Sequence, residues 1–316
     1  SLKVLSTETR HLGTTLAKDI FQQMYETMES RVHFTFEADV HTICKNETFL
    51  IKTDRGEFTS RRLVLATGKS GSEWLKKQTE SLGVVPGETR LDLGIRVEMR
   101  GNQLNSILGE TFETKLKYEA DTFTSTTYCM NPQGRIIRKR QHGLVMPDGQ
   151  NQKEEETPSG NLNFTLFVPR YFPTYEKAMS KARHVIGNIN QGGERIVVQR
   201  LRDLKTNSPT NCSSRLAIRP SLKASVGNLH DEVPPLYVDA LLEFFSKLEG
   251  LIGEQLDQDT LLYGIDAKFF EPKHYTDSQF MTQITGLYLI GDCSGETHSL
   301  SQAAASGIYL GQQLGH

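Results

Sequence analysis

The sequence predicts an α/β fold in which a doubly wound domain, present only in part, is interrupted by a β-rich α+β insertion. Two apolar runs, at residues 63–66 and 287–290, lie about 220 residues apart, and each leads to a glycine. Strands that are apolar on both faces are typical of parallel sheets covered by helices. Between these runs, parts of residues 91–281 alternate apolar and polar side chains, which indicates antiparallel strands.

The bulk composition restricts the class of protein. A chain of 316 residues suits about two domains, and its formal net charge of −2 gives little attraction to nucleic acid or anionic membranes. No apolar run approaches the ~18 residues that a membrane span needs, and no signal peptide is recognisable at the start. The four cysteines are scattered without CxxC spacing, so we expect a cytoplasmic protein without a zinc site.

The first 90 residues predict one helix, one strand and a small meander. Apolar side chains recur at helical spacing over residues 14–28, where a threonine is available as the N-cap. Strand-like runs follow at residues 32–36, 38–44, 48–53 and 57–59. Gly56 supplies the positive φ that a hairpin turn needs.

The insertion alternates strands, one polar loop and helices. We expect strands at residues 93–98, 122–130 and 162–168, a turn at 131–134 and a polar loop at 150–160. Two helices are predicted at residues 175–186 and 235–249, the second of them ended by Gly250.

The segment 286–307 carries the strongest chemical signal. Asp292 follows a buried strand, so its carboxylate would stand at the carboxyl edge of the sheet, where α/β proteins bind ligands. Gly295 would let backbone approach a ligand, and Ser299 or Ser301 could cap a helix whose N-terminus favours negative charge. The alternative is a plain strand–loop–helix corner. A second, shorter signal is Thr67 with Gly68, for which a structural turn is the simpler interpretation.

Taken in order along the chain, several segments resemble a family of bacterial and archaeal FAD-dependent dehydrogenase-like proteins, within the glutathione-reductase-like flavoproteins. The matching segments are residues 10–14, 65–70, 93–98, 128–134, 199–203, 262–266 and 286–307. The resemblance therefore spans nearly the whole chain, although each motif by itself is short.

The resemblance implies a discontinuous, incomplete FAD-binding domain at residues 1–90 and 282–316, and a substrate domain at 91–281. It implies an oxidoreductase that moves a hydride between NAD(P)H and a small-molecule substrate through FAD. It assigns no catalytic residue. The implied FAD contacts follow the two apolar strands: Thr67, Gly68, Gly291, Asp292, Gly295, Ser299, Leu300, Ser301 and Gln302.

Three features depart from that family. The chain has no Gly-x-Gly-x-x-Gly turn in a strand–turn–helix setting, and it lacks the acidic residue that binds the adenosine ribose. Residues 296–299 (ETHS) stand where the relatives have a glycine-rich turn. We therefore expect a C-terminal two-thirds of such a protein that holds FAD weakly or not at all, with an open sheet edge through which it self-associates.

Several other residues have two interpretations. His298 could act on a substrate or be a loop residue, and Cys293 could be a redox thiol or a small buried residue. Arg96 and Glu98 could form an ion pair or line a substrate cavity. A basic hairpin (Arg135, Arg138, Lys139, Arg140 and His142) could bind an anion or solvate an edge strand.

Two rival functions follow from these features. The chain could be a non-catalytic module that binds a partner through its insertion. It could also belong to a flavoprotein that modifies RNA through the basic hairpin, although nucleic acid is an improbable partner at this net charge.

Overall fold

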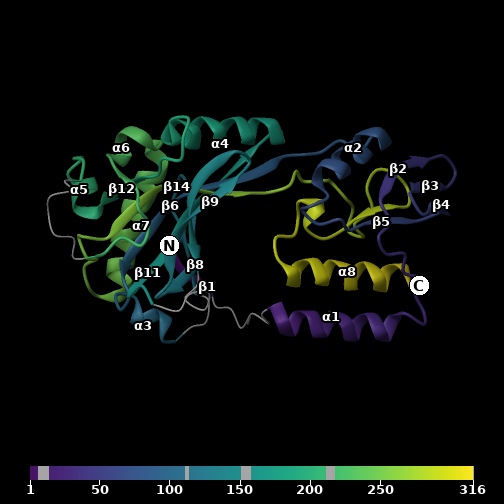
Figure 1. Ribbon diagram of the computed structural model, residues 1–316, viewed down its shortest axis with the longest axis horizontal. Helices are drawn as coiled ribbons and strands as arrows, with labels where there is room; N and C mark the ends of the chain where they lie inside the picture. Colours follow the sequence, from purple (N-terminus) through teal and green to yellow (C-terminus); the bar gives the residue numbers. More distant parts are fainter. Residues whose placement is uncertain (6–13, 111–113, 151–157, 211–217, 316) are drawn as a thin grey trace. The chain divides into compact units, whose positions relative to one another are not determined.

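A computed structural model describes residues 1–5, 14–110, 114–150, 158–210 and 218–315. The motif at 10–13 and most of the predicted loop at 150–160 lie outside these ranges. The chain divides into two compact units. Unit 1 comprises Ser1–Thr9, Arg90–Phe172 and Glu176–Phe269, and unit 2 comprises Arg10–Thr89, Pro173–Tyr175 and Phe270–His316 (Figure 1). Both are described separately below.

Unit 1 is built on a mixed eight-stranded sheet. The strand order is β1-β7-β8-β11-β6-β14-β12-β13, in which β12 and β13 are parallel. β1 pairs antiparallel with β7, so the first residues of the chain lie in this unit and not with the rest of residues 1–90. The strands are β1 (Leu2–Leu5), β6 (Thr89–Arg100), β7 (Lys115–Glu119), β8 (Thr124–Pro132), β11 (Asn161–Phe172), β12 (Val197–Arg200), β13 (Ser225–Val226) and β14 (Leu261–Phe269).

The acidic end of β7 holds β1 in place. Lys3 Nζ lies 2.7 Å and Lys117 Nζ 3.0 Å from the Glu119 carboxylate, and these two lysines lower the pKa of Glu119 to about 2. The stabilisation is present above the ordinary glutamate pKa of about 4.3 and is lost as the pH falls through the folded value. We expect an NMR titration of Glu119 to give a midpoint near 2, and Lys3→Gln to raise it. A midpoint near 4.3 in the unaltered chain would mean that these pairs do not form.

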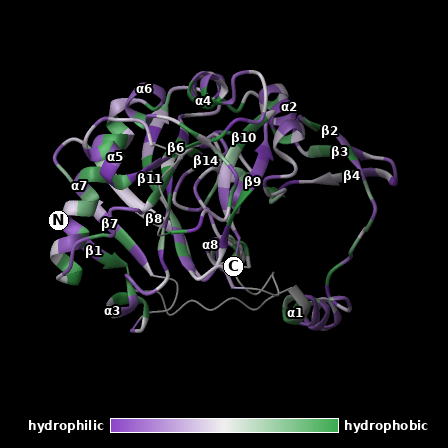
Figure 2. Cartoon of the chain, turned by 60° about the vertical axis from the view of Figure 1, so that its left-hand side comes forward, coloured by the Kyte–Doolittle hydropathy of each residue, from purple (hydrophilic) through white to green (hydrophobic). Residues whose placement is uncertain are grey.

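The two faces of the large sheet differ in chemistry, since hydrophilic and hydrophobic residues alternate along its strands (Figure 2). Alternate residues of β6, Leu91 to Met99, join the main hydrophobic core with helices α4 (Tyr175–Asn190) and α7 (Pro235–Ile252). The residues between them, Asp92, Arg96 and Glu98, are buried as well. A hairpin of β9 (Arg135–Gln141) and β10 (Leu144–Gln150) packs against this second, polar face. The sequence pattern predicted the alternation correctly but gave no sign that both faces are covered.

Helix α7 runs three residues further than the sequence suggested. Gly250 lies inside the helix, and Gly253, with φ of 74°, adopts the left-handed conformation at its end. Ile252 packs against the main core, which extends the helix past the first glycine. Short helices α3 (Asn105–Leu108), α5 (Leu201–Lys205) and α6 (Leu229–Glu232) complete the unit. Among the residues described, no helix is long and apolar enough to cross a membrane.

The described residues of unit 2 form a three-stranded antiparallel meander, a parallel strand pair and three α-helices. The meander, β2 (Val40–Lys45), β3 (Phe49–Thr53) and β4 (Gly56–Ser60), forms as predicted. A small core of Phe49, Leu65, Leu75, Leu287 and Leu289 joins it to the parallel pair and to α2 (Ser72–Leu82). Helices α1 (Thr14–Met28) and α8 (Leu300–Leu314) occupy the two ends of this unit's sequence.

The parallel pair joins two strands that are far apart in the sequence. β5 (Leu63–Leu65) and β15 (Leu287–Leu289) pair in register, with Leu63 opposite Leu287 and Leu65 opposite Leu289 (Figure 1). Both apolar runs are therefore strands of one parallel sheet, as the sequence predicted. In the described part of the chain no strand pairs with the other edge of β5. The Val64 side chain of this strand is 38% exposed.

Residues 32–36 do not form the predicted strand. A strand needs a neighbour for its backbone hydrogen bonds, and no described strand pairs with this segment. Its aromatic side chains pack locally instead. Phe34 and Phe36 stack on each other with ring centroids 5.7 Å apart, and Tyr25 of α1 lies 5.1 Å from Phe34.

Candidate cofactor site

The carboxyl ends of β5 and β15 meet at one edge of the parallel pair in unit 2. Thr67 and Gly68 follow β5, and Gly291 and Asp292 follow β15. Gly68 and Gly291 have φ values of 61° and 70°, which side chains other than glycine rarely tolerate. A Cβ built on Gly68 would meet no atom within 4 Å, so open space lies in front of this turn. The two turns therefore expose backbone at a common edge.

Asp292 begins a short 3-10 helix at this edge, Asp292–Ser294. Its Oδ1 accepts a hydrogen bond of 2.8 Å from Thr297 Oγ1. Its second carboxylate oxygen accepts none from the residues that the structure describes. The side chain is half-buried. Asp292 is therefore oriented by Thr297 and retains an oxygen that can accept a hydrogen bond from a ligand hydroxyl.

The start of helix α8 is capped in both directions. The Ser299 side chain accepts a hydrogen bond from Gln302 N, and Gln302 Oε1 accepts one of 2.9 Å from His298 N. Ser299 is thus the N-cap, one of the two serines proposed for that role. Leu300 and Ser301 lie in the exposed first turn, where Leu300 is 85% exposed. A helix N-terminus of this kind favours negative charge nearby.

Gly295 has a packing role that the sequence did not reveal. A Cβ at this position would lie 2.5 Å from the Pro272 carbonyl oxygen, and its φ is 75°. The close approach that requires glycine is therefore to residues 272–273 of the same chain. This accounts for Gly295 without a ligand.

Residues 270–274 lie beside this edge and were missed because they fall within the predicted insertion and carry no motif. The backbone N–H of His274 donates to Ser294 O at 2.8 Å, and the Phe270 ring lies 4.5 Å from the His298 ring. Burial raises the pKa of Glu271, while Ser72 and Lys69 oppose that shift. A carboxyl group with a raised pKa beside a ligand edge is a candidate proton carrier.

Two titratable side chains near this edge have structural roles. Cys293 is buried, with Sγ 3.2 Å from Ile290 O, and burial raises the pKa of its thiol. A thiol with a raised pKa is a poor redox nucleophile, so the small-residue interpretation holds. His298 packs edge-on against Phe270, which agrees with its interpretation as a loop residue.

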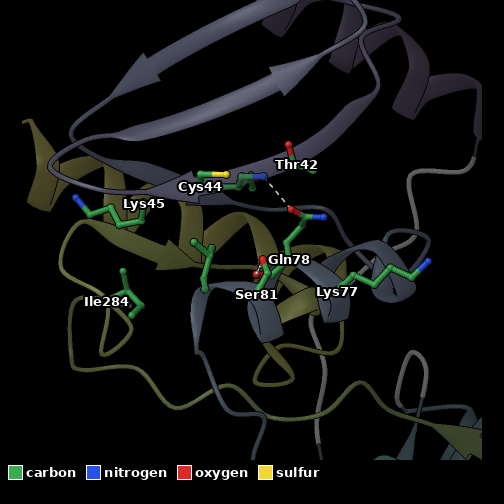
Figure 3. Close-up of a pocket in the computed structure, with 9 residues that line it drawn as sticks. Thr42, Cys44, Lys45, Lys77, Gln78, Ser81 and Ile284 are labelled. Carbon is green, nitrogen blue, oxygen red and sulfur yellow. Dashed lines mark hydrogen bonds between the residues drawn. The ribbon is translucent and has the colours of Figure 1, made fainter.

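A hollow in unit 2, with a volume of about 560 Å³, lies elsewhere and is lined by none of the candidate cofactor residues (Figure 3). It lies between β2 and α2. Gln78 of α2 bridges the two elements: its Oε1 accepts from Ile43 N at 2.9 Å and its Nε2 donates to His41 O at 3.2 Å. The amide thereby pairs with the open edge of β2, and Lys45 Nζ is bonded to Glu47 O. These polar groups serve the fold, so we assign this hollow no ligand.

The basic hairpin of unit 1 is engaged within the protein. Lys139 Nζ lies 3.1 Å from Asp266 and 3.3 Å from Asp148, and Arg140 pairs with Glu194. These ion pairs offset the charge of two of the hairpin's cations, Lys139 and Arg140. Across the described residues, no three His, Cys, Asp or Glu side chains gather as a metal site requires.

Arg96 and Glu98 are both buried, and no ion pair joins the two side chains in the described part of the chain. Arg96 bonds to Asn163 Oδ1 and, at 3.0 Å, to Thr165 Oγ1. Glu98 accepts hydrogen bonds of 2.8 Å from Asn161 and 2.7 Å from the Tyr263 hydroxyl. Each side chain therefore belongs to a buried polar network beneath the hairpin.

The fold defines an α/β protein with a large mixed sheet. Comparisons with protein-family models and with curated protein sequences give no match. A solved structure named "Putative protoporphyrinogen oxidase", from Exiguobacterium sp. 255-15, aligns with 93% of this chain at 12% identity and a TM-score of 0.25. The chain spans 51% of the length of that structure. A TM-score this low supports no inference about fold or function.

Proposed function

We propose that this chain is part of a flavin-dependent oxidoreductase and that unit 2 contributes to its FAD site. The observation that carries the proposal is the in-register pairing of β5 with β15, which brings Gly68 and Asp292 to one sheet edge. In open α/β sheets, ligands bind outside the carboxyl ends of the strands. The sequence resemblance to FAD-dependent dehydrogenases supports FAD as the ligand.

The residues at this edge fit a dinucleotide. Backbone at Gly68 is open to close approach, and one oxygen of Asp292 is available to a ribityl or ribose hydroxyl. The first turn of α8 would stabilise negative charge on the ligand. Burial raises the pKa of Glu271, which makes its carboxyl group a candidate proton carrier beside this edge. When bound, FAD would supply hydride transfer, with a reduced nicotinamide as the proposed donor and a small molecule as the acceptor.

We expect Asp292→Ala to weaken FAD binding about ten- to a hundredfold without unfolding unit 2, because a hydrogen bond to a charged acceptor is worth ~1.5–3 kcal/mol. The measurement is quenching of flavin fluorescence as protein is added. Glu296→Ala is the matched control: this carboxylate is four residues away and pairs with Lys273 at 2.9 Å. If the unaltered chain and Asp292→Ala bind FAD with equal affinity, Asp292 makes no contact with FAD and has only a structural role in the turn.

A further inference from the structure

Helix α1 of unit 2 carries an apolar stripe that is exposed along its length. Apolar side chains recur every four residues at positions 16, 20, 24 and 28, with Phe21 beside them. Phe21 is 62%, Met24 51% and Leu16 50% exposed. None of the hydrophobic clusters that the described residues form contains a residue of α1. Since helices in proteins owe most of their stability to the burial of such a stripe, α1 requires a partner surface.

Helix α8 of the same unit exposes a surface that carries no charge. Its residues, LSQAAASGIYLGQQL, include no Asp, Glu, Lys or Arg, although only Ser306 and Leu310 among them are buried. Ile308 is 65% exposed. Ala304 and Gly311 lie four and three residues away on the same face of the helix, and their small side chains leave a groove beside Ile308. The face that a helix turns to water is usually charged, so this uncharged face suits an apolar partner.

The charges of α1 suit a protein partner better than a membrane surface. Lys18, Asp19 and Glu26 lie on the side of the helix opposite to the apolar stripe, where they mix both signs. Helices that lie on membranes carry a polar face rich in Lys and Arg. Neither α1 nor α8 has such a face.

The area of these helix faces decides which contact two copies of the chain can form. Each of the two helices has 15 residues, so half of its surface covers about 350 Å² at a length of ~22 Å and a width of ~10 Å. Two α1 helices packed on two α8 helices would bury about 1,400 Å² in total, within the range of ~1,200–2,000 Å² for stable interfaces. A single pair of α1 helices would bury about half of that area, which is below this range.

We infer that two copies of this chain form a symmetric dimer in which α1 of each copy packs against α8 of the other. Every copy carries both the apolar stripe and the uncharged face, so the contact is self-complementary and closes after two copies. The charged side of α1 stays in water. The inference does not depend on FAD binding, because Ile308 lies about two helical turns beyond the first turn of α8.

The test is sedimentation equilibrium of the full chain over a range of micromolar concentrations. We expect the unaltered chain to form a dimer. Phe21→Asp and Ile308→Asp each bury two charges per dimer and should raise the dissociation constant roughly tenfold or more. An equimolar mixture of the two variants should recover part of the dimer, because the mixed dimer retains one unaltered contact between α1 and α8.

Val85→Asp is the matched control, since Val85 is 72% exposed in unit 2 but lies outside both helices. This variant should dimerise as the unaltered chain does. Circular dichroism checks that each variant is folded, and Met24→Asp replaces Phe21→Asp if the latter is not. The inference is overturned if the unaltered chain is monomeric throughout, or if Ile308→Asp remains fully dimeric. It is also overturned if Val64→Lys alone dissociates the dimer, because the contact would then be the open edge of β5.

Discussion

Replacing Gly149 with alanine is expected to destabilise unit 1 by about 3–5 kcal/mol, the cost typical of breaking a buried charged network. A Cβ at this position would lie 1.5 Å from Arg96 Nη2 and 2.4 Å from Asn131 Nδ2. Arg96 is fully buried and cannot swing into solvent. The hairpin must move away from the sheet, or Arg96 must give up its bonds to Asn163 and Thr165. Urea unfolding of the chain measures the loss.

Gly250→Ala is the matched control for this prediction. Gly250 also lies in unit 1, but a Cβ there would meet nothing within 4 Å, and the residue is inside helix α7. Alanine should therefore stabilise the unit by roughly 0.5–1 kcal/mol, because glycine is the poorer helix former. The two substitutions add the same methyl group and should have opposite signs. A Gly149→Ala variant as stable as the unaltered chain would show that the hairpin does not cover Arg96 closely.

The sequence predicted those elements whose signal is local. Ser299 and Ser301 were proposed as caps of the last helix, of which Ser299 caps α8, and the meander is marked by its turn at Gly56. Residues 63–65 and 287–289 were predicted as strands of a parallel sheet because both runs are apolar at every position. In each case the information lies within a few residues of the feature itself.

The failures concern features that depend on distant residues. Residues 32–36 have a strand-like sequence but no partner strand among the described residues, so local preference cannot form a ladder. Arg96 and Glu98 were interpreted as an ion pair or as the lining of a substrate cavity, because alternation alone does not show what covers the second face of a strand. Glu271 and His274 lie near Ser294 only through the fold, since no motif links the two segments.

The same dependence on distant residues leads to a prediction about the cofactor. This chain should purify colourless, or with far less than one flavin per protein. In glycine-rich dinucleotide folds the pyrophosphate is bound by backbone N–H groups at the start of the first helix, after the glycine-rich turn. The sequence contains no such turn, so the edge at Gly68 and Asp292 would contact the ligand without its strongest anchor.

The expected deficit in affinity is large. Several charge-assisted hydrogen bonds of ~1.5–3 kcal/mol each are missing, which corresponds to several orders of magnitude in affinity. The measurement is the ratio of flavin absorbance to protein absorbance after gel filtration of the chain mixed with FAD. The control is FAD passed over the same column without protein, which shows where free flavin elutes. A ratio near one for the unaltered chain would mean that the α8 N-terminus or another part of the chain binds the pyrophosphate directly. The FAD site would then include phosphate contacts beyond Thr67, Gly68, Gly291 and Asp292. The first turn of α8 would be the first candidate for those contacts.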